Sequence, residues 1–198
     1  MSLTNTPPLK TQRLLLRKFD VNDIEALSSI YSDEDVNKYL PMFPLKSLDE
    51  ASAFFKEKYA EIYNQPTGYK YAVCLKSNNI PIGYVNLSIG GGYDFGYGLK
   101  KEFWHNGITT EACLAVVNLL GKTDIPFITA THDVNNPRSG NVMKNIGMTY
   151  CYSYEEQWQP KDIPVIFRMY QLNFDGQNDR VFKEYWDNSK IRFVEKNL

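Results

Sequence analysis

The chain has 198 residues, 43% of them hydrophobic, which suffices for one compact domain with a substantial core and no structural disulfide or metal. Its 22 Lys and Arg residues nearly balance its 23 Asp and Glu residues, which argues against a broad nucleic-acid or acidic-membrane footprint. The three cysteines stand far apart outside any C-x-x-C pattern, no apolar run has membrane-spanning length, and the N-terminus lacks signal-peptide order, so we expect a cytoplasmic, metal-free protein without a membrane partner.

The first part of the chain predicts a strand and two helices. Residues 11–19 (TQRLLLRKF) have the composition of a strand bounded by charges, and Asp20 can cap an amphipathic helix after it. Ser47 and Glu50 have the spacing of a capping box, which predicts a second helix that ends before Pro66.

The middle of the chain predicts an antiparallel meander and then a strand–helix–strand unit. Three strand-like runs, separated by polar or glycine-rich turns, cover Tyr69 to Leu75, Ile80 to Ile89 and Tyr93 to Leu99. An apolar helix from Glu111 to Leu120 and a β-rich run from Phe127 to His132 complete a unit suited to parallel pairing.

The last third predicts a short helix, a closing hairpin and an appended helix. Asn136-Pro137 combines a good helix cap with a proline suited to the first helical position. The runs 148–157 and 164–174 read as the two strands of a hairpin, and the aromatic segment 182–186 predicts a final helix.

One turn in the sequence has the pattern of an anion-binding site. The stretch YDFGYGLKKEFWHNGITTEA, residues 93–112, places a strand, a glycine-containing turn and a helix start in that order. A helix start offers unpaired amide N–H groups and the positive end of the helix dipole to a phosphate. Gly107 permits close backbone approach, and Thr109 and Thr110 leave the amides accessible while adding hydroxyl donors. An ordinary β–α turn with a glycine is an equally open reading.

A second helix start follows in the stretch NNPRSGNVMKNIGM, residues 135–148. Its helix would point toward the same sheet edge as the first, which would leave a cleft between the two helix starts. Taken singly, Asn136 is a helix cap and Ser139 an exposed residue of the first turn. Their pairing with the upstream turn favours a binding site.

Three motifs in this order resemble the GNAT superfamily of acetyltransferases, and specifically its branch of bacterial ribosomal-protein N-terminal acetyltransferases. Residues 11–17 resemble the family's T-x-R-L-x-L-R strand, and residues 96–112 resemble its G-Y-x-L…W-x-x-G-x-x-T-E-A segment. Residues 136–147 resemble its N-x-x-S…K-x-x-G segment, so that the resemblance covers residues 9–174.

The resemblance implies an α+β fold with α/β/α layers, in which about seven strands form a mixed, strongly twisted, mostly antiparallel sheet. Strands 4 and 5 would splay apart, and their backbone would pair with the pantetheine amides of acetyl-CoA, the expected co-substrate. We expect one domain over residues 1–174, a C-terminal helical extension over residues 175–198 packed on it, and a monomer or a homodimer.

The resemblance also implies which residues hold the cofactor. Leu99 would face the pantetheine and the thioester oxygen, and Asn136 and Ser139 would lie near the pantetheine and the sulfur. The residues that would surround the pyrophosphate are His105, Asn106, Gly107, Thr109 and Thr110.

Three positions depart from the pattern of the family. Trp104 stands where the wider superfamily prefers Arg or Gln, although Trp is common there in the branch that the chain resembles, and Thr109 stands where the superfamily prefers a second Gly or Ala. Met143 stands where many relatives carry a general-acid tyrosine, so that this acid is absent from its usual place.

Attack of a neutral amine on the thioester needs a base, donors for the oxyanion and a proton for the departing thiolate. Asp94 matches an acidic position of many relatives and is our first choice for the base or amine anchor. His132 is the alternative, because a neutral imidazole titrates near working pH. Ser139 could relay a proton to the thiolate, whereas Glu111, in the first helical turn, suits dipole and packing roles.

Two other classes of function stay open on the residues alone. A non-catalytic acyl-CoA-binding or scaffold protein would keep the cleft without turnover. A cysteine hydrolase would use Cys113 or Cys151 with His132, although no nucleophile turn surrounds either cysteine. The amine acceptor, a protein N-terminus or a small molecule, is also left open.

Overall fold

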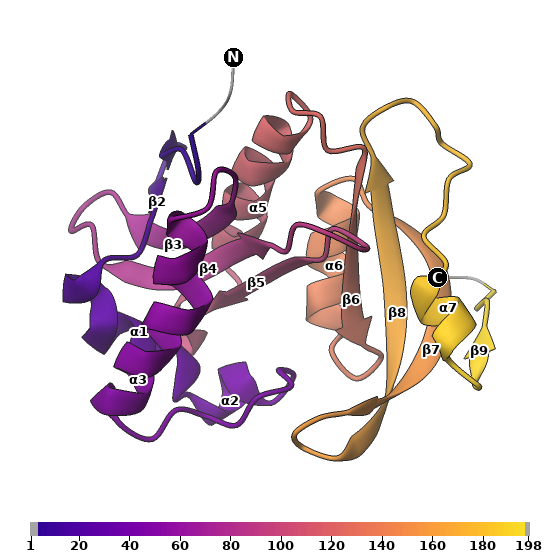
Figure 1. Cartoon of the computed structure of the whole chain (residues 1–198), viewed down its shortest axis with the longest axis horizontal. Coiled ribbons are helices and arrows are strands. Elements are labelled where there is room, and N and C mark those ends of the chain that lie inside the picture. The colour runs from indigo at the N-terminus through magenta and orange to yellow at the C-terminus, as the bar shows by residue number, and fades with distance from the viewer. Residues whose placement is uncertain (1–3, 197–198) are drawn as a thin grey trace.

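Two β-sheets form the body of the molecule, and the computed structural model describes residues 4–196 (Figure 1). The strands of the first sheet are β1 (Leu9–Lys10), β2 (Leu14–Arg17), β3 (Tyr69–Leu75), β4 (Pro81–Leu87) and β5 (Phe95–Leu99), in spatial order β1-β2-β3-β4-β5. The strands of the second are β6 (Phe127–Asp133), β7 (Thr149–Trp158), β8 (Ile163–Asn173) and β9 (Arg192–Phe193), in spatial order β6-β8-β7-β9. Hydrogen-bonded neighbours within each sheet are antiparallel.

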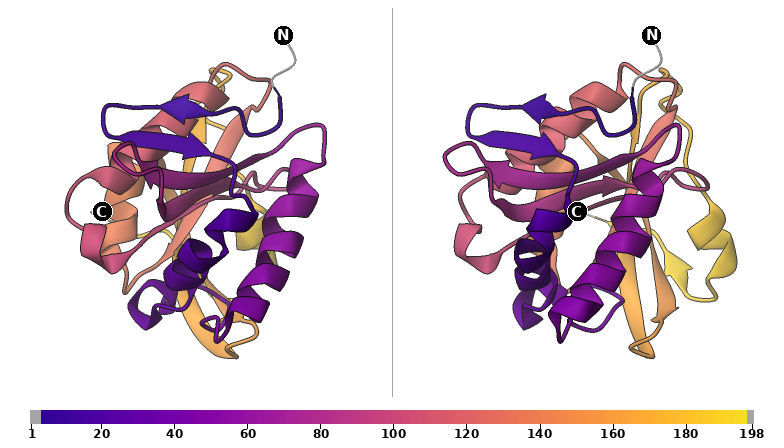
Figure 2. Two further views of the ribbon diagram at one scale, coloured as in Figure 1. Left: turned by 90° about the vertical axis from the view of Figure 1, so that its left-hand side faces the viewer. Right: turned by 60° about the vertical axis from the view of Figure 1, so that its left-hand side comes forward.

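Helices cover both faces of the first sheet. The α-helices of the described chain are α1 (Ile24–Tyr31), α2 (Glu34–Asn37), α3 (Leu48–Phe55), α4 (Glu61–Tyr63), α5 (Ile108–Leu120), α6 (Pro137–Asn145) and α7 (Glu184–Asn188), of which α6 and α7 pack on the second sheet. Figure 2 shows α1 and α3 side by side on one face of this sheet, with α5 on the other. A π-helical turn, Lys56–Ala60, joins α3 to α4, and 3-10 turns stand at Val21–Asp23 and Lys101–Phe103.

The helix starts use the capping residues that the sequence predicts. Ser47 Oγ accepts a hydrogen bond from the Glu50 N–H at 3.1 Å, and α3 begins at the residue after Ser47. Asn136 caps α6, and Pro137 follows it in the first turn. Asp20 likewise caps the 3-10 turn that leads into α1.

Alternating side chains of the first sheet build two cores. Tyr71 and Val85 pack with Val116 of α5 on one face. Ala72 and Tyr84, each adjacent in sequence to one of them, pack with α1 and α3 on the other face. Strands β3 and β4 are therefore buried on both sides, and β5 pairs with β4 at the edge of the sheet.

The two sheets meet at one point between β5 and β6. A single parallel bridge joins Asp94 to Thr129, where the Thr129 N–H donates to Tyr93 O at 3.1 Å. Beyond this bridge the strands separate, and β6 pairs with β8 instead. The α+β fold and the splay of the fourth and fifth predicted strands, here β5 and β6, are thereby confirmed.

The structure adds elements to those expected. The strands divide between two sheets that share only this bridge, and the two-residue strands β1 and β9 come in addition to the seven strands predicted. The sequence also did not predict α2. Segments this short show no alternation or helical periodicity, so their sequences carry too little pattern to identify them.

The C-terminal segment lies against the second sheet. β9 pairs with β7 through Ser153 opposite Phe193. The Tyr154 ring stacks on the Tyr185 ring with centroids 5.2 Å apart, and Trp186 meets Tyr152 edge-on at 5.4 Å. These contacts bury aromatic surface of both the segment and the sheet.

The predicted final helix corresponds to α7, which begins at Glu184. The division of the chain into residues 1–174 and 175–198 stays a prediction, and residues 1–3 and 197–198 of those units lie outside the described residues. Across residues 4–196, the helices are too short or too polar to span a membrane.

Candidate functional site

The turn between β5 and α5 has left-handed backbone at two residues. His105 has φ +63° and Gly107 has φ +68°, a region in which glycine carries no steric penalty. α5 begins at Ile108 without a side-chain cap, and the Glu111 N–H donates to Gly107 O at 3.0 Å. The amides before Glu111 in this turn have no helical carbonyl to bond, so they are the donors that an anion would meet.

Side chains within the turn hold its shape. Trp104 Nε1 donates to Leu99 O at 2.8 Å, and Asn106 Nδ2 donates to Trp104 O at 3.0 Å. Arg13 Nη1 donates to Asn106 O at 2.8 Å, which ties the turn to the hairpin of β1 and β2. The Asn106 side chain is therefore used inside the turn.

Glu111 joins the start of α5 to the same hairpin. Its carboxylate accepts hydrogen bonds from Thr11 Oγ1 at 2.5 Å, Arg13 Nε at 2.6 Å and the Arg13 N–H at 3.0 Å. Desolvation acts to raise the pKa of Glu111, but these hydrogen bonds outweigh it and hold the pKa below the ordinary 4.5. The carboxylate is thus occupied in packing the turn, as expected from its helical position.

The start of α6 faces the turn from across the split between β5 and β6. Asn136 Oδ1 accepts from the Ser139 N–H at 3.4 Å, a long contact, and Pro137 has no N–H to leave unpaired. The Arg138 guanidinium lies 5.6 Å from the centroid of the Trp104 ring. The two segments therefore approach each other closely over the split.

A groove of about 700 Å³ lies between these two segments. The expected cofactor residues that line it are Leu99, His105, Gly107, Thr109, Thr110, Asn136 and Ser139. Asn106 is not part of the lining, because its side chain turns back into the turn. The exposed cations Lys38 and Arg138 also line the groove and could pair with phosphate groups.

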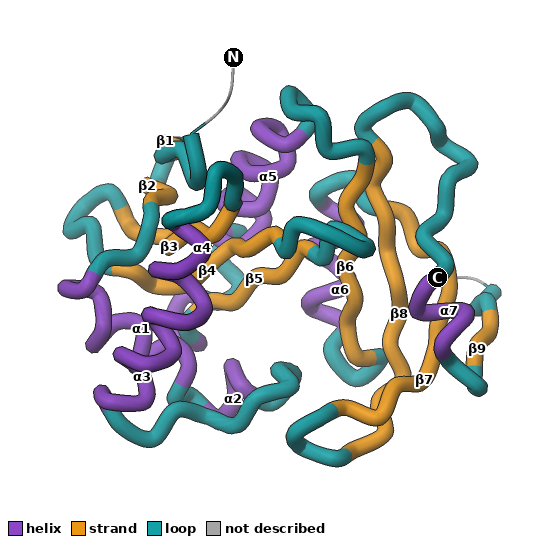
Figure 3. Tube along the Cα trace, in the orientation of Figure 1, coloured by secondary structure: helices purple, strands orange, loops and turns teal. Residues whose placement is uncertain are grey.

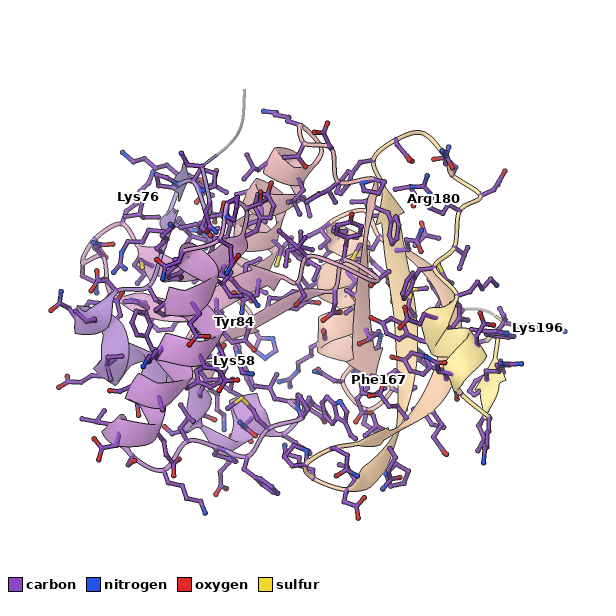
Figure 4. The ribbon with its side chains drawn as sticks, in the orientation of Figure 1. Lys58, Lys76, Tyr84, Phe167, Arg180 and Lys196 are labelled. Atoms are coloured by element: carbon purple, nitrogen blue, oxygen red, sulfur yellow. The ribbon has the colours of Figure 1, made fainter. Side chains whose placement is uncertain are left out.

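A second cavity of about 210 Å³ adjoins the groove. The two spaces share the residues Val36, Tyr39, Tyr97, Gly98, Asn136 and Ser139. Tyr84 of the first sheet and Phe167 of the second line the smaller cavity from its two sides (Figure 4). Ligands in the groove and in the cavity would therefore meet at the shared residues.

Asp94 lines the smaller cavity beside the bridge between the sheets. Its side chain is open to solvent but lies in a recess of protein atoms, so its hydration is incomplete. This desolvation raises the pKa of Asp94 to about 6; the Lys70 ammonium opposes the rise and the Glu156 carboxylate adds to it. A carboxyl with this pKa is ionised at neutral pH and can still take up a proton.

His132 also lines the smaller cavity but is only 4% exposed. Its Nδ1 lies 2.8 Å from Asp133 O, which assigns the proton to Nδ1 and leaves Nε2 as an acceptor. Nε2 has no partner among the described residues, and a Cβ placed at Gly140 would come within 2.5 Å of it. Burial lowers the pKa of His132, so the ring is a neutral group packed against α6.

Ser139 has a partner that the sequence did not reveal. Tyr97 Oη donates to Ser139 O at 2.7 Å and lies 3.0 Å from Ser139 Oγ. Tyr97 stands on β5 between Phe95 and Leu99, which face the same core, so strand alternation could have placed it toward α6. Met143, at the position of the missing tyrosine, lines the same cavity.

The α2 segment forms a wall that the sequence also did not reveal. Val36 and Tyr39 line both spaces, and Tyr39 Oη donates to Asn135 O at 3.0 Å. Lys161 Nζ, from the tip of the β7–β8 hairpin, donates to Asn37 O at 2.9 Å and lies 3.2 Å from Asn37 Oδ1. Figure 3 shows α2 and this hairpin tip at the same end of the molecule.

The cysteines have surroundings that disfavour the thiolate. Cys113 lies on the buried face of α5, fully inside the core, and burial raises the pKa of its thiol. Burial also raises the pKa of Cys151 to about 11. Both shifts oppose the reactivity that a cysteine hydrolase needs. The described part of the chain brings no three His, Cys, Asp or Glu side chains together as a metal site.

A sequence model of the family described as "Acetyltransferase (GNAT) domain" matches residues 13–149, more than half of the chain. The chain belongs to this GNAT family. The matched range contains the β5–α5 turn, the bridge between the sheets and α6, so the two helix starts described above lie in the part that defines the family.

Two Bacillus subtilis proteins are similar in sequence to this GNAT domain. The uncharacterized N-acetyltransferase YnaD is 28% identical over 144 residues, which cover 71% of this chain and 81% of YnaD. The uncharacterized N-acetyltransferase YoaA is 25% identical over 116 residues, which cover 57% of this chain and 65% of YoaA, just under two thirds of that relative.

Solved structures show the same GNAT architecture. An acetyltransferase of the GNAT family from Bacillus anthracis superposes with a TM-score of 0.72 at 25% identity, over 85% of this chain and 99% of that one. A Vibrio cholerae spermidine N-acetyltransferase, in complex with CoA and spermine, gives 0.69 at 15% identity over 82% and 96%. A V. cholerae protein provisionally named a ribosomal-protein-serine acetyltransferase gives 0.71 at 17% identity over 86% and 99%. The last two show the fold alone.

Proposed function

We propose that this GNAT domain is an acetyl-CoA-dependent N-acetyltransferase that transfers an acetyl group directly to a primary amine. The observation that carries the proposal is the split between β5 and β6. On one side of the split lies the groove between the two helix starts. On the other side lies the small cavity, which is lined by the carboxylate of Asp94. Tyr97 and Ser139 line both the groove and the cavity. A thioester and an amine could meet at these walls.

In the groove, the pyrophosphate of acetyl-CoA would bind over the first turn of α5. Gly107, Thr109 and Thr110 supply the exposed backbone and hydroxyl donors there, with His105 beside them. The pantetheine arm would run along the free edge of β5 at Leu99, as an added strand. Asn106 would contribute through its backbone, because its side chain is bonded within the turn.

In the cavity, the amine nitrogen would attack the thioester carbonyl. The new N–C bond forms as the C–S bond breaks, the amine proton passes to the Asp94 carboxylate directly or through water, and the departing thiolate takes a proton relayed by Ser139. A thiol pKa near 8.5 makes a weak donor sufficient. His132 would serve as a neutral acceptor near the cavity, with Asp94 as the favoured base because its carboxyl is reached by solvent.

The release of free CoA thiol in the presence of acetyl-CoA and a broad panel of amines tests this function. We expect release that depends on both the amine and the protein. Tight binding of acetyl-CoA without release for any amine would favour the non-catalytic acyl-CoA-binding protein instead. Mass spectrometry of the product would then identify the acetylated nitrogen.

Tyr97 is proposed to act through Ser139. Ser139→Ala should lower kcat roughly tenfold, since water can replace a weak acid for a thiolate. Tyr97→Phe should lower kcat less and leave KM for acetyl-CoA nearly unchanged, because it removes only the hydroxyl that holds Ser139.

The double variant distinguishes a shared role from separate ones. If Tyr97 acts through Ser139, the kcat of Tyr97→Phe/Ser139→Ala equals that of Ser139→Ala alone. Losses that multiply would show that the two side chains act independently, and a large rise in KM would show that Tyr97 only shapes the groove.

A further inference from the structure

The size of the smaller cavity limits the acceptor. Its volume of about 210 Å³ compares with about 700 Å³ for the adjoining groove. Pockets for drug-sized ligands begin near 300 Å³. An acceptor that fits this cavity is therefore a small molecule or the first residue of a longer chain.

The wall formed by α2 opposes a longer chain. Lys161 Nζ joins the hairpin tip to Asn37 O, and Asn37 is 1% exposed, so the half-buried lysine closes over a buried residue. Tyr39 Oη joins the same segment to Asn135 O on the other side. A peptide that trailed from a bound α-amine toward this wall would have to displace one of these contacts.

The charges of the cavity favour a cation and oppose an anion. Besides tyrosines, the ionisable side chains that line it are Asp94, Asp133 and the neutral His132, and the lining contains no Lys or Arg from residues 4–196. Asp133 Oδ1 accepts hydrogen bonds from the Asn135 N–H at 2.7 Å and from Asn135 Nδ2 at 2.9 Å, which hold that carboxylate in its own turn, so Asp94 is the carboxylate available to a bound amine. An ammonium group is attracted to this site, whereas a second carboxylate on the acceptor would be repelled.

Aromatic rings supply the rest of the wall. The rings that line the cavity belong to Tyr39, Tyr84, Tyr97, Trp158 and Phe167. Such faces bind both alkylammonium groups and aromatic rings. One free carboxylate surrounded by aromatic faces is an arrangement for an amine whose remainder is apolar.

We infer that the acceptor is a small primary alkylamine or arylalkylamine without a carboxylate, and that neither a free amino acid nor a protein N-terminus is the preferred substrate. The inference rests on the proposed acetyltransferase function and names the substrate class of the same site.

Matched acceptors test the inference with the full chain. kcat/KM from CoA thiol release is compared for phenethylamine, phenylalanine, phenylalaninamide and phenylalaninamide extended by three alanines, each corrected for its fraction of neutral amine. We expect kcat/KM for phenethylamine to exceed that for phenylalanine by about tenfold or more, because the carboxylate of phenylalanine is repelled by the carboxylate of Asp94. Phenylalaninamide has no carboxylate, so its kcat/KM should lie near that of phenethylamine. The extended peptide should fall about tenfold below phenylalaninamide because of the wall.

Two variants assign these preferences to their causes. Asp94→Asn should lower all rates but reduce the ratio between phenethylamine and phenylalanine to about threefold or less, since the carboxylate available to the acceptor is gone and only Asp133, held in its own turn, remains. Lys161→Met should raise the extended peptide relative to phenylalaninamide, whereas Lys122→Met, at an exposed lysine remote from the cavity, should not. A melting curve for each variant checks that it remains folded.

The outcomes distinguish a wrong acceptor class from a wrong proposed function. CoA release only with amino acids or the extended peptide overturns the inference and leaves the acetyltransferase function standing. A charge preference that persists in Asp94→Asn also overturns it. Binding of acetyl-CoA without release for any of these acceptors overturns the function and the inference together.

Discussion

Gly107→Glu is expected to raise the dissociation constant for acetyl-CoA by roughly a hundredfold or more. The substitution places a carboxylate at the cap of α5, where the proposed pyrophosphate would lie, and two like charges about 4 Å apart repel by roughly 4 kcal/mol near a protein surface. Among residues 4–196, apart from its chain neighbours, a Cβ at this position would meet Arg13 Nη2 alone within 4 Å, at 3.8 Å, so there is room for the new side chain. Isothermal titration with acetyl-CoA measures the effect.

The matched control is Gly107→Lys. Both substitutions force a side chain into the left-handed backbone at φ +68°, so both carry the same strain of about 1–2 kcal/mol, but the lysine brings a charge that attracts phosphate. We expect Gly107→Lys to keep affinity within about tenfold of the original chain. Equal losses in both variants would show that strain, and not charge, explains the effect, and unchanged affinity in Gly107→Glu would refute the pyrophosphate assignment.

Asp94→Asn is expected to lower kcat/KM by roughly 10²–10⁴ near neutral pH, the range of a general base. With Asp94 present, kcat/KM should rise with pH through about 6, because the carboxyl must lose its proton before it can accept one from the amine. The asparagine variant should lack this ascending limb. The two curves should approach each other at high pH, where the amine is already neutral. A pH–rate profile with several amines separates this limb from the titration of the acceptor.

Neighbouring charges provide two controls with opposite signs. Lys70 lowers the pKa of Asp94, so Lys70→Met should move the ascending limb to higher pH. Glu156 raises that pKa, so Glu156→Gln should move the limb to lower pH. Shifts in these directions would assign the limb to Asp94. A limb that neither variant moves belongs to His132, to water or to the substrate.

Local signals were sufficient for much of the fold. The capping box at Ser47 and Glu50 and the Asn136-Pro137 start predict α3 and α6, because a cap is formed by residues within four positions of each other. The meander and the long strands of the second sheet follow from alternation. The turn at Gly107 could be recognised for the same reason, since its strand, glycine and helix start are consecutive.

Contacts between distant segments could not be predicted in this way. Tyr97 and Ser139 are 42 positions apart, and Lys161 and Asn37 are 124 apart. No periodicity connects such pairs, because their meeting depends on how the two sheets separate at the bridge between Asp94 and Thr129. The wall of α2 was missed for this reason.

The sequence by itself determined the glycine turn before α5, the helix starts and the resemblance to the GNAT family, because each depends on residues close together in the chain. The tertiary structure decided what lies on the other side of the split. The cavity, its aromatic walls and the raised pKa of Asp94 arise where β4, β5, β7, β8 and the α2 segment converge. Desolvation and charge depend on everything that surrounds a group, and those surroundings exist only once the chain has folded.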